Sequence, residues 1–372
     1  MLKRKKRVLL HGYDSDNLGD DLFFRLLVTR YSHVQFVMPT LNLKSKARFA
    51  DLANLKIIDF RKIARFARDY TYVLPKLYSW LFMRCFDAVV YIGGSLFIDH
   101  REYSAQYQYV IENYSFLCDY KIAAKAKVPC YLLGANWGPS YHDYFYKFFN
   151  QAFDSMQDIF FRDKYSYEIF KSKPQVRFGG DILMGSSFIS HAIPPVKKLK
   201  NQIAFSIIAA RKDLNPDSEA YIMEIIRICR EFISAGYQVK LLSFCITEGD
   251  QKTAEKVIRE IKCPPEQISH LAYTDNWQEM LITLAQSELV VASRFHAAVL
   301  GWTLNTKVFS LLYSQKTQNL LNDCNITDGS IWLNDIGKVT AEYMLEHAVL
   351  LQNPEKFSGE RSAFKKLDQV LY

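Results

Sequence analysis

The chain has 372 residues, of which 49% are hydrophobic and 23% are charged. This length predicts two domains, and the apolar content excludes disordered and collagen-like chains. Lys and Arg number 47 against 39 Asp and Glu, and the resulting net charge of +8 favours an anionic partner without identifying it.

The seven Cys residues include no C-x-x-C spacing. The sequence therefore predicts a reducing, cytoplasmic compartment, with neither a disulfide framework nor a zinc cluster. The basic segment Lys3–Arg7 precedes only three apolar residues, Val8–Leu10, too few for an export signal. No run reaches the roughly 18 apolar residues of a membrane-spanning helix. We therefore expect a chain that is soluble or bound peripherally at the inner face of the cell membrane.

The first predicted strand, Val8–Leu10, leads into a turn with two Gly and four Asp that opens a helix ending near Arg30. The turn fits neither a dinucleotide fingerprint nor a P-loop nor a calcium loop. Two interpretations stay open: a glycine turn with an acidic helix cap, or a ligand site that includes Asn17, Gly19 and Asp20.

Polar or glycine-rich turns follow three later strands of the N-terminal half. Gly94, Ser95 and Asp99 follow one strand, Asn136 follows the next, and Arg162 the one after. Because the carboxyl ends of parallel strands meet at one edge of a sheet, these turns predict a ligand-binding edge, while each alone also has a structural interpretation. The predicted strands after the first are Val34–Val37, Ala88–Ile92, Val128–Leu133, Ile159–Phe161 and Val176–Phe178.

The segment Phe60–Arg84 mixes cations with aromatic and aliphatic side chains. This composition is typical of an amphipathic element at an anionic membrane, and it equally fits a helix packed on the first domain with a solvated basic face.

The segment Ser190–Lys200, with paired prolines and several Lys, is interpreted as a linker. We predict an N-terminal domain over residues 1–192 and a C-terminal domain over residues 200–372, and whether the C-terminal helix packs back on the first domain stays open. After residue 200, strands and helices alternate, which predicts a mostly parallel sheet covered by helices. The strands are Ile203–Ala209, Gln238–Phe244, Ile268–Ala272, Leu289–Ala292 and Lys307–Leu312, and the helices are Glu219–Ala235, Asp250–Lys262, Trp277–Ser287 and His296–Thr303.

The residues Ser293, Arg294 and His296 lie where a buried strand ends and a helix begins. The planar fork of Arg can hold a carboxylate or phosphate, and His can carry a proton near neutral pH, beside the free N–H groups of a helix start. The alternative is an Arg–carboxylate pair with a hydrogen-bonded structural His. Arg211 follows the strand Ile203–Ala209 and is a second cation expected at the same edge.

In combination, the turns resemble those of the polysaccharide pyruvyl transferase family over roughly residues 7–312. The shared motifs are Gly12…Asn17-x-Gly19-Asp20, Gly93-Gly94-Ser95…Asp99, Gly134…Gly138-Pro139, Arg162-Asp163…Ser166 and Ser293-Arg294-x-His296. The Arg-x-His before an Ala-rich helix is the most specific of them. The sequence departs from the family where the usual glycine triplet reads Gly-Gly-Ser and where Asn136-Trp137 stands in the Gly-Pro loop.

The resemblance implies an α/β, GT-B-like fold: two doubly wound Rossmann-like domains facing a central cleft. It also implies transfer of a pyruvyl group from phosphoenolpyruvate to a sugar of a cell-surface polysaccharide or its lipid-linked precursor, which forms a ketal and releases phosphate. Ser293, Arg294 and His296 would bind the donor in the C-terminal domain, and Arg211 is our addition to that site. On the N-terminal, acceptor side, the candidates are Asn17, Gly19, Gly94, Ser95, Asp99 and Asn136.

This donor needs a general acid, because its enol carbon must be protonated before the neighbouring carbon becomes electrophilic. His296 is the predicted acid, and Arg294 and Arg211 would hold the carboxylate and phosphate and stabilise the leaving group. Asp20 or Asp99 would orient or deprotonate the sugar hydroxyl. No cofactor or metal is expected.

Two other functions stay open at the level of the sequence. A GT-B nucleotide-sugar glycosyltransferase would hold a diphosphate with the same cations, and a non-catalytic glycan-binding protein would keep the fold alone. A nucleic-acid partner is not expected, because the cations are dispersed and no recognised binding motif occurs. The expected partners are phosphoenolpyruvate, a glycan or lipid-linked saccharide, and an anionic membrane surface.

Overall fold

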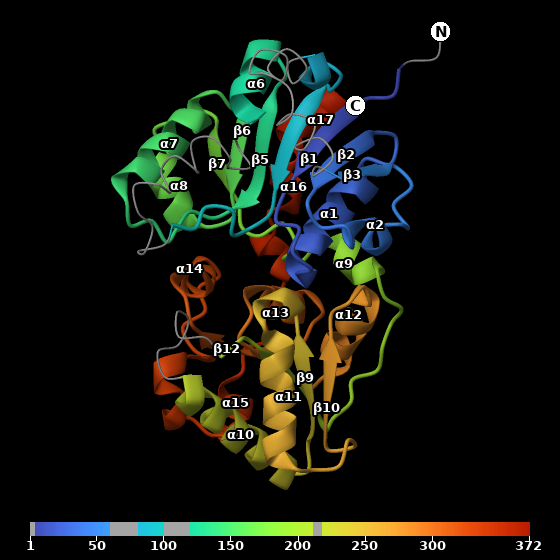
Figure 1. The fold of residues 1–372 in the computed structure, drawn as a ribbon. Coiled ribbons are helices and arrows are strands. Elements are labelled where there is room, and N and C mark those ends of the chain that lie inside the picture. Colours follow the sequence, from blue (N-terminus) through green and yellow to red (C-terminus); the bar gives the residue numbers. More distant parts are fainter. Residues whose placement is uncertain (1–3, 60–80, 100–118, 211–217) are drawn as a thin grey trace. The chain divides into compact units, whose positions relative to one another are not determined.

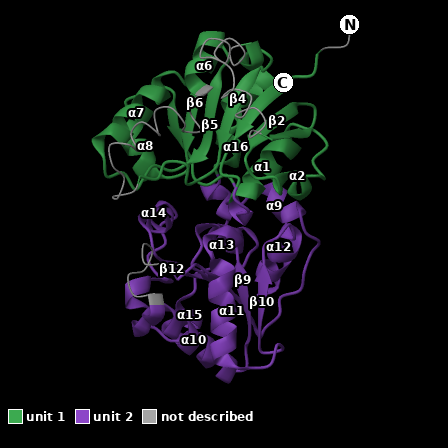
Figure 2. Ribbon diagram, viewed as in Figure 1, with its two compact units in different colours: residues 1–14, 20–182, 359–372 green, residues 15–19, 183–358 purple. Residues whose placement is uncertain are grey.

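The computed structural model describes residues 4–59, 81–99, 119–210 and 218–372 (Figure 1). The chain divides into two compact units, shown in different colours in Figure 2. Unit 1 comprises residues 1–14, 20–182 and 359–372, and unit 2 comprises residues 15–19 and 183–358. Each unit is built on its own parallel sheet.

Unit 1 contains a seven-stranded sheet in the order β3-β2-β1-β4-β5-β6-β7, and all neighbouring strands run parallel. Every residue of β4 and β5 is buried, as expected for central strands covered on both faces. The strands are β1 (Arg7–His11), β2 (Gln35–Thr40), β3 (Leu55–Asp59), β4 (Ala88–Ile92), β5 (Cys130–Ala135), β6 (Asp158–Phe161) and β7 (Val176–Phe178). The described helices are α1 (Leu18–Arg30), α2 (Ser45–Arg48), α6 (Asp119–Ala126), α7 (Asp143–Asp154), α8 (Lys164–Phe170), α16 (Glu360–Ala363) and α17 (Lys365–Leu371).

Unit 2 contains a six-stranded sheet in the order β10-β9-β8-β11-β12-β13, again with parallel neighbours. The strands are β8 (Gln202–Ile207), β9 (Gln238–Ser243), β10 (Ile268–Ala272), β11 (Leu289–Ala292), β12 (Lys307–Leu312) and β13 (Ser330–Trp332). The α-helices are α9 (Ser187–His191), α10 (Ser218–Ser234), α11 (Asp250–Ile261), α12 (Trp277–Gln286), α13 (Phe295–Thr303), α14 (Gln315–Asp323) and α15 (Ala341–His347), with short 3-10 helices η1 (Ile246–Glu248), η2 (Leu333–Lys338) and η3 (Pro354–Phe357).

Both strand orders are doubly wound: the chain moves outward on one side of the first strand and then reverses to the other side. Counting strands within each unit, both orders begin 3-2-1-4-5-6, which is the Rossmann order. The expected fold class, α/β with two Rossmann-like sheets as in the GT-B fold, is confirmed.

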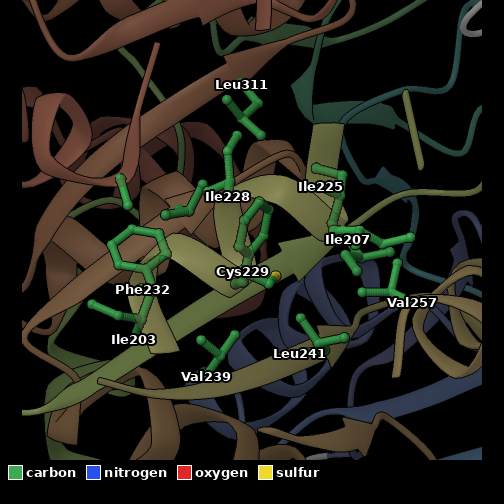
Figure 3. Close-up of a cluster of buried hydrophobic side chains, with 14 of the residues drawn as sticks. Ile203, Ile207, Ile225, Ile228, Cys229, Phe232, Val239, Leu241, Val257 and Leu311 are labelled. Atoms are coloured by element: carbon green, nitrogen blue, oxygen red, sulfur yellow. The ribbon is translucent and has the colours of Figure 1, made fainter. Parts of the chain in front are cut away.

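The core of unit 2 shows why its sequence forms helices against strands (Figure 3). Strand β8 buries all six of its residues, and α11 buries Ala254, Val257 and Ile261 at helical spacing on one face. Phe232 and Cys229 of α10 complete the packing over the sheet. This rigid core fixes the carboxyl ends of the strands, where the candidate site lies.

The chain passes from unit 1 to unit 2 at residues 182 and 183, earlier than the predicted linker at 190–200. The reason is that Thr303 of α13 holds the incoming segment: its hydroxyl donates to the Leu183 carbonyl at 3.2 Å and accepts from the Gly185 N–H at 2.9 Å. Residues 359–372 return to unit 1, where the Tyr31 hydroxyl donates to Asp368 of α17 at 2.6 Å.

Candidate functional site

The Arg-x-His motif lies at the carboxyl end of β11, in the turn that opens α13. The Ser293 N–H donates to the Ser206 carbonyl of β8 at 3.2 Å, so the turn is tied to the neighbouring strand. Every residue of α13 is buried, because the helix packs on β11 and β12 and also contacts α9, α12 and η3. His296 in the first turn of α13 is therefore held in a rigid environment, with 9% of its surface exposed.

The Arg294 guanidinium is engaged by two carboxylates of its own unit. Its Nε atom donates to Asp250 at 2.9 Å, its Nη2 atom also bonds Asp250, and its Nη1 atom bonds Glu248. Burial alone lowers the pKa of Arg294, but Asp250 and then Glu248 outweigh it and raise that pKa well above its ordinary value. The Arg–carboxylate pair that the sequence left open as an alternative is therefore formed, and this cation is balanced within unit 2.

Residues 15–19, which follow β1 in the sequence, are part of unit 2 and form what we call the strap. The Leu18 N–H donates to the Phe244 carbonyl at 3.0 Å, and Asn17 forms an antiparallel bridge with Cys245. The Thr247 hydroxyl donates to the Ser15 carbonyl at 2.7 Å. The strap is thus bonded to the residues that follow β9.

The strap brings Gly19 against His296. A Cβ atom built on Gly19 would lie 1.8 Å from Nδ1 of the imidazole, so only glycine fits beside the ring as it stands. The sequence placed Asn17 and Gly19 on the acceptor side with the N-terminal domain, whereas the structure places both in unit 2. The deviation arises because the strap bonds to the residues that follow β9 and to η1.

The start of α14, at the carboxyl end of β12, is a feature that the sequence analysis missed. Ser314 is the N-cap and Thr317 lies in the first turn, and neither hydroxyl has a hydrogen-bond partner among the described residues. Thr317 is 1% exposed, and burial of a hydroxyl without a hydrogen bond costs free energy of folding. Lys316 lies between them in the sequence, with Nζ 5.6 Å from the centre of the Tyr313 ring. The signal available in the sequence was the run Ser-Gln-Lys-Thr directly after a strand.

A buried polar cluster lies at the carboxyl edge of the unit 1 sheet. Arg162, which follows β6, donates from Nη2 to Asn136 at 2.6 Å and from Nη1 to Asp181 at 3.2 Å. Its guanidinium lies against Gly94, where a Cβ would be 2.2 Å from Nη1. Two predicted acceptor-side residues, Gly94 and Asn136, are therefore brought together by Arg162, whose position after a strand was visible in the sequence.

The remaining candidates of unit 1 are placed differently from one another. Asp20 is 7% exposed and lies beside Gly93, where a Cβ would be 3.4 Å from its Oδ1 atom. Ser95 is half-buried. Asp99 is fully buried and accepts from the backbone N–H groups of Tyr141 and His142 at 2.7 and 2.8 Å. These bonds anchor the loop that contains Tyr141 and His142.

Asp14 of the acidic turn is occupied by donors of unit 1. Its carboxylate accepts from Thr40, Ser45 and Arg48, and Arg48 also pairs with Asp21 at 2.7 Å. In the part of the chain that the structure describes, no group of three or more His, Cys, Asp or Glu could hold a metal ion. Two of the four Asp in the first turn are therefore explained by packing around Arg48.

Two predictions fall on residues that lie outside the described ranges. Arg211 belongs to the segment 211–217, and most of the basic aromatic segment belongs to residues 60–80. Within residues 4–59, 81–99, 119–210 and 218–372, no helix combines the length and the apolar character needed to cross a bilayer.

Solved structures with similar folds cover nearly the whole chain. The UDP-GlcNAc 2-epimerase of Methanocaldococcus jannaschii superposes with a TM-score of 0.57 over 99% of each chain, at 10% identity. S. aureus MnaA, in a co-structure with UDP, gives a TM-score of 0.61 at 11% identity, over 99% of this chain and 98% of MnaA. Similarity at these identities shows the fold alone.

Sequence comparison is more specific. The amylovoran biosynthesis protein AmsJ of Erwinia amylovora is 24% identical in an alignment 278 residues long, which covers 66% of this chain and 61% of AmsJ. The chain thus spans about three fifths of that relative's length. The family model described as polysaccharide pyruvyl transferase matches residues 17–315, from the strap to the start of α14. Because that match covers most of the chain, the chain belongs to the polysaccharide pyruvyl transferase family.

Proposed function

We propose that the chain transfers a pyruvyl group from phosphoenolpyruvate to a sugar of a cell-surface polysaccharide or its lipid-linked precursor, forming a ketal and releasing phosphate. The observation that carries the proposal is the buried His296 imidazole at the carboxyl end of β11, inside the family match over residues 17–315. Ligands of Rossmann-like sheets bind at this end of the strands.

The proposed transfer requires protonation of one carbon of phosphoenolpyruvate and releases phosphate. His296 gives a proton to the methylene carbon of the donor, which makes the neighbouring carbon electrophilic. A sugar hydroxyl attacks the electrophilic carbon and gives its proton to Asp20, and proton exchange with solvent afterwards restores both Asp20 and the imidazole. The bond to phosphate breaks, and a second hydroxyl of the same sugar closes the ketal and gives its proton to the departing phosphate. Atoms and electrons balance without a cofactor.

The donor carries several negative charges, and Arg294 is already balanced by Asp250 and Glu248. We therefore assign Arg294 to holding the turn beside His296. Support for the donor phosphate comes instead from the start of α14, where the hydroxyls of Ser314 and Thr317 are unsatisfied among the described residues and Lys316 adds a positive charge. Arg211 remains the second cation of the proposal.

The acceptor side rests on unit 1. Asp20, beside Gly93, is the carboxylate proposed to orient or deprotonate the sugar hydroxyl, and Ser95 is proposed to contact the saccharide. A lipid-linked acceptor presented at an anionic membrane, and a cytoplasmic location facing it, belong to the same proposal.

Phosphate release from phosphoenolpyruvate in the presence of candidate glycans tests the proposal. The wild-type chain is expected to release phosphate only with an acceptor, and His296→Ala is expected to lower kcat by about 10²–10⁴-fold, the usual range for removing a general acid. His347→Gln is the matched control, since His347 is a half-buried residue of α15 that pairs with Asp328 outside the candidate site. Equal rates for wild type and His296→Ala would overturn the assignment.

The two alternative functions make different predictions in the same assay. A nucleotide-sugar glycosyltransferase would be stabilised against heat by a UDP-sugar and not by phosphoenolpyruvate, whereas the proposed enzyme shows the reverse. A glycan-binding protein without catalysis would release no phosphate, and its glycan affinity would be unchanged by His296→Ala.

A further inference from the structure

The first loop of the chain ends inside unit 2, in contact with the proposed catalytic His. Three hydrogen bonds fix the strap there. The Leu18 N–H donates to the Phe244 carbonyl and thereby forms the bridge between Asn17 and Cys245, and the Cys245 thiol and the Thr247 hydroxyl both donate to the Ser15 carbonyl. Within the strap, the Gly19 N–H donates to the Asn17 side chain at 3.1 Å. The backbone that leads into Gly19 is therefore fixed to unit 2.

The contact between Gly19 and His296 is closer than any side chain would allow. A Cβ at residue 19 would lie 1.8 Å from Nδ1, 2.3 Å from Cγ and 2.5 Å from Cε1 of the imidazole, all shorter than the 3.0 Å below which something must shift. The ring is short and stiff and stands in the first turn of a fully buried helix, so it has little room to yield.

We propose that Gly19 is a positioning residue that packs against the Nδ1 side of His296 and fixes the plane of the ring that gives the proton to the substrate. This inference rests on the proposed function, because it deepens the role of His296. It also assigns a role to the strap, which holds Gly19 against the His296 ring and so helps to orient the proposed proton donor of unit 2.

The decisive experiment is a double-mutant cycle between the two residues. Gly19→Ala is expected to lower kcat by about 10–100-fold, since a displacement of about 1 Å at a reacting group costs this much. In the His296→Ala background the same substitution is expected to change the rate by less than about twofold, because there is no ring left to displace. Gly337→Ala is the matched control in unit 2, since its Cβ would lie at an ordinary 3.6 Å from Glu224.

A second measurement does not need the reaction. The ¹⁵N chemical shifts of the His296 ring nitrogens, assigned by their absence in His296→Ala, are expected to change in Gly19→Ala and to stay unchanged in Gly337→Ala. If wild type releases no phosphate from phosphoenolpyruvate, the proposed function fails while this measurement still tests the contact. Unchanged shifts, or equal effects of Gly19→Ala with and without His296, overturn the inference.

A milder variant protects the test against misfolding. Thr247→Val removes the hydroxyl that donates to the Ser15 carbonyl and adds no atom beside the ring. If Gly19→Ala does not fold, Thr247→Val is expected to shift the same two nitrogen resonances, because the strap is loosened. Resonances identical to wild type in that variant would overturn the inference.

Discussion

Arg294 and Asp250 form a doubly hydrogen-bonded ion pair inside unit 2. Nε of Arg294 donates to Oδ2 of Asp250 at 2.9 Å, and Nη2 bonds the other carboxylate oxygen. The same Oδ2 accepts from the backbone N–H of Cys245 at 3.0 Å, so one carboxylate joins the residues after β9 to the end of β11. Since the strap also bonds to Cys245, the ion pair is linked both to the strap and to the turn that precedes His296.

Removing Arg294 is expected to destabilise unit 2 strongly. Arg294→Met leaves Asp250 buried without its cation, and breaking a buried pair in this way costs about 3–5 kcal/mol of unfolding free energy. Urea denaturation measures the change. The matched control is Lys256→Met, which removes a 2.8 Å pair with the exposed Glu219 and is expected to cost less than about 1 kcal/mol. Equal losses for both variants would contradict the structural role given to Arg294.

Most of the fold could be predicted from the sequence because the central strands are short apolar runs between turns. Five predicted strands match the observed bounds: Ala88–Ile92, Val176–Phe178, Ile268–Ala272, Leu289–Ala292 and Lys307–Leu312. Two strands were missed, β3 and β13, and both lie at the edge of a sheet. Neither strand contains a buried residue. Because such strands need no continuous apolar run, their sequences resemble those of the adjoining loops.

The candidate site was harder to predict, because its contacts join residues that are distant in the sequence. The Arg-x-His motif was visible at the end of β11, whereas the carboxylates that balance Arg294 come from η1 and the start of α11. The contact between Gly19 and His296 depends on where the strap binds, which no local pattern encodes.

Gly94 is expected to tolerate no side chain while Arg162 is present. A Cβ would overlap Nη1, and the guanidinium is held in place by Asn136 and Asp181. Gly94→Ala is therefore expected to cost about 1–3 kcal/mol of unfolding free energy, the usual penalty for overpacking a buried site. In an Arg162→Ala background the same substitution is expected to cost clearly less, since the overlapping group is gone. A constant penalty in both backgrounds, again by urea denaturation, would show that the strain lies elsewhere.

Asp99 and Asp20 are expected to respond differently to the loss of their charge. Asp99 accepts from two backbone N–H groups and from Nδ1 of His142 at 3.1 Å, so Asp99→Asn, which replaces one acceptor by a donor, is expected to cost about 1–3 kcal/mol of stability. The kcat of the folded variant is expected to stay near that of wild type. Asp20→Asn is expected to lower kcat, because Asp20 is the proposed base. Phosphate-release kinetics and denaturation on both variants decide, and the opposite pattern would make Asp99 the base.

His270 makes the stability of unit 2 dependent on pH. It lies on β10 with Nε2 at 2.8 Å from the Ser243 hydroxyl, and burial lowers its pKa below the ordinary 6.5, although Glu255 offsets part of the effect. The unfolded chain therefore takes up this proton more readily than the folded one, so stability is lost as the pH falls below about 6.5. In His270→Gln, which keeps a hydrogen-bonding side chain and cannot titrate, this loss is expected to disappear. The unfolding free energy of wild type minus that of His270→Gln should be constant from pH 8 to 7 and fall between pH 6.5 and 5. A difference that stays flat across the whole range would mean that the folded and unfolded chains protonate His270 equally well.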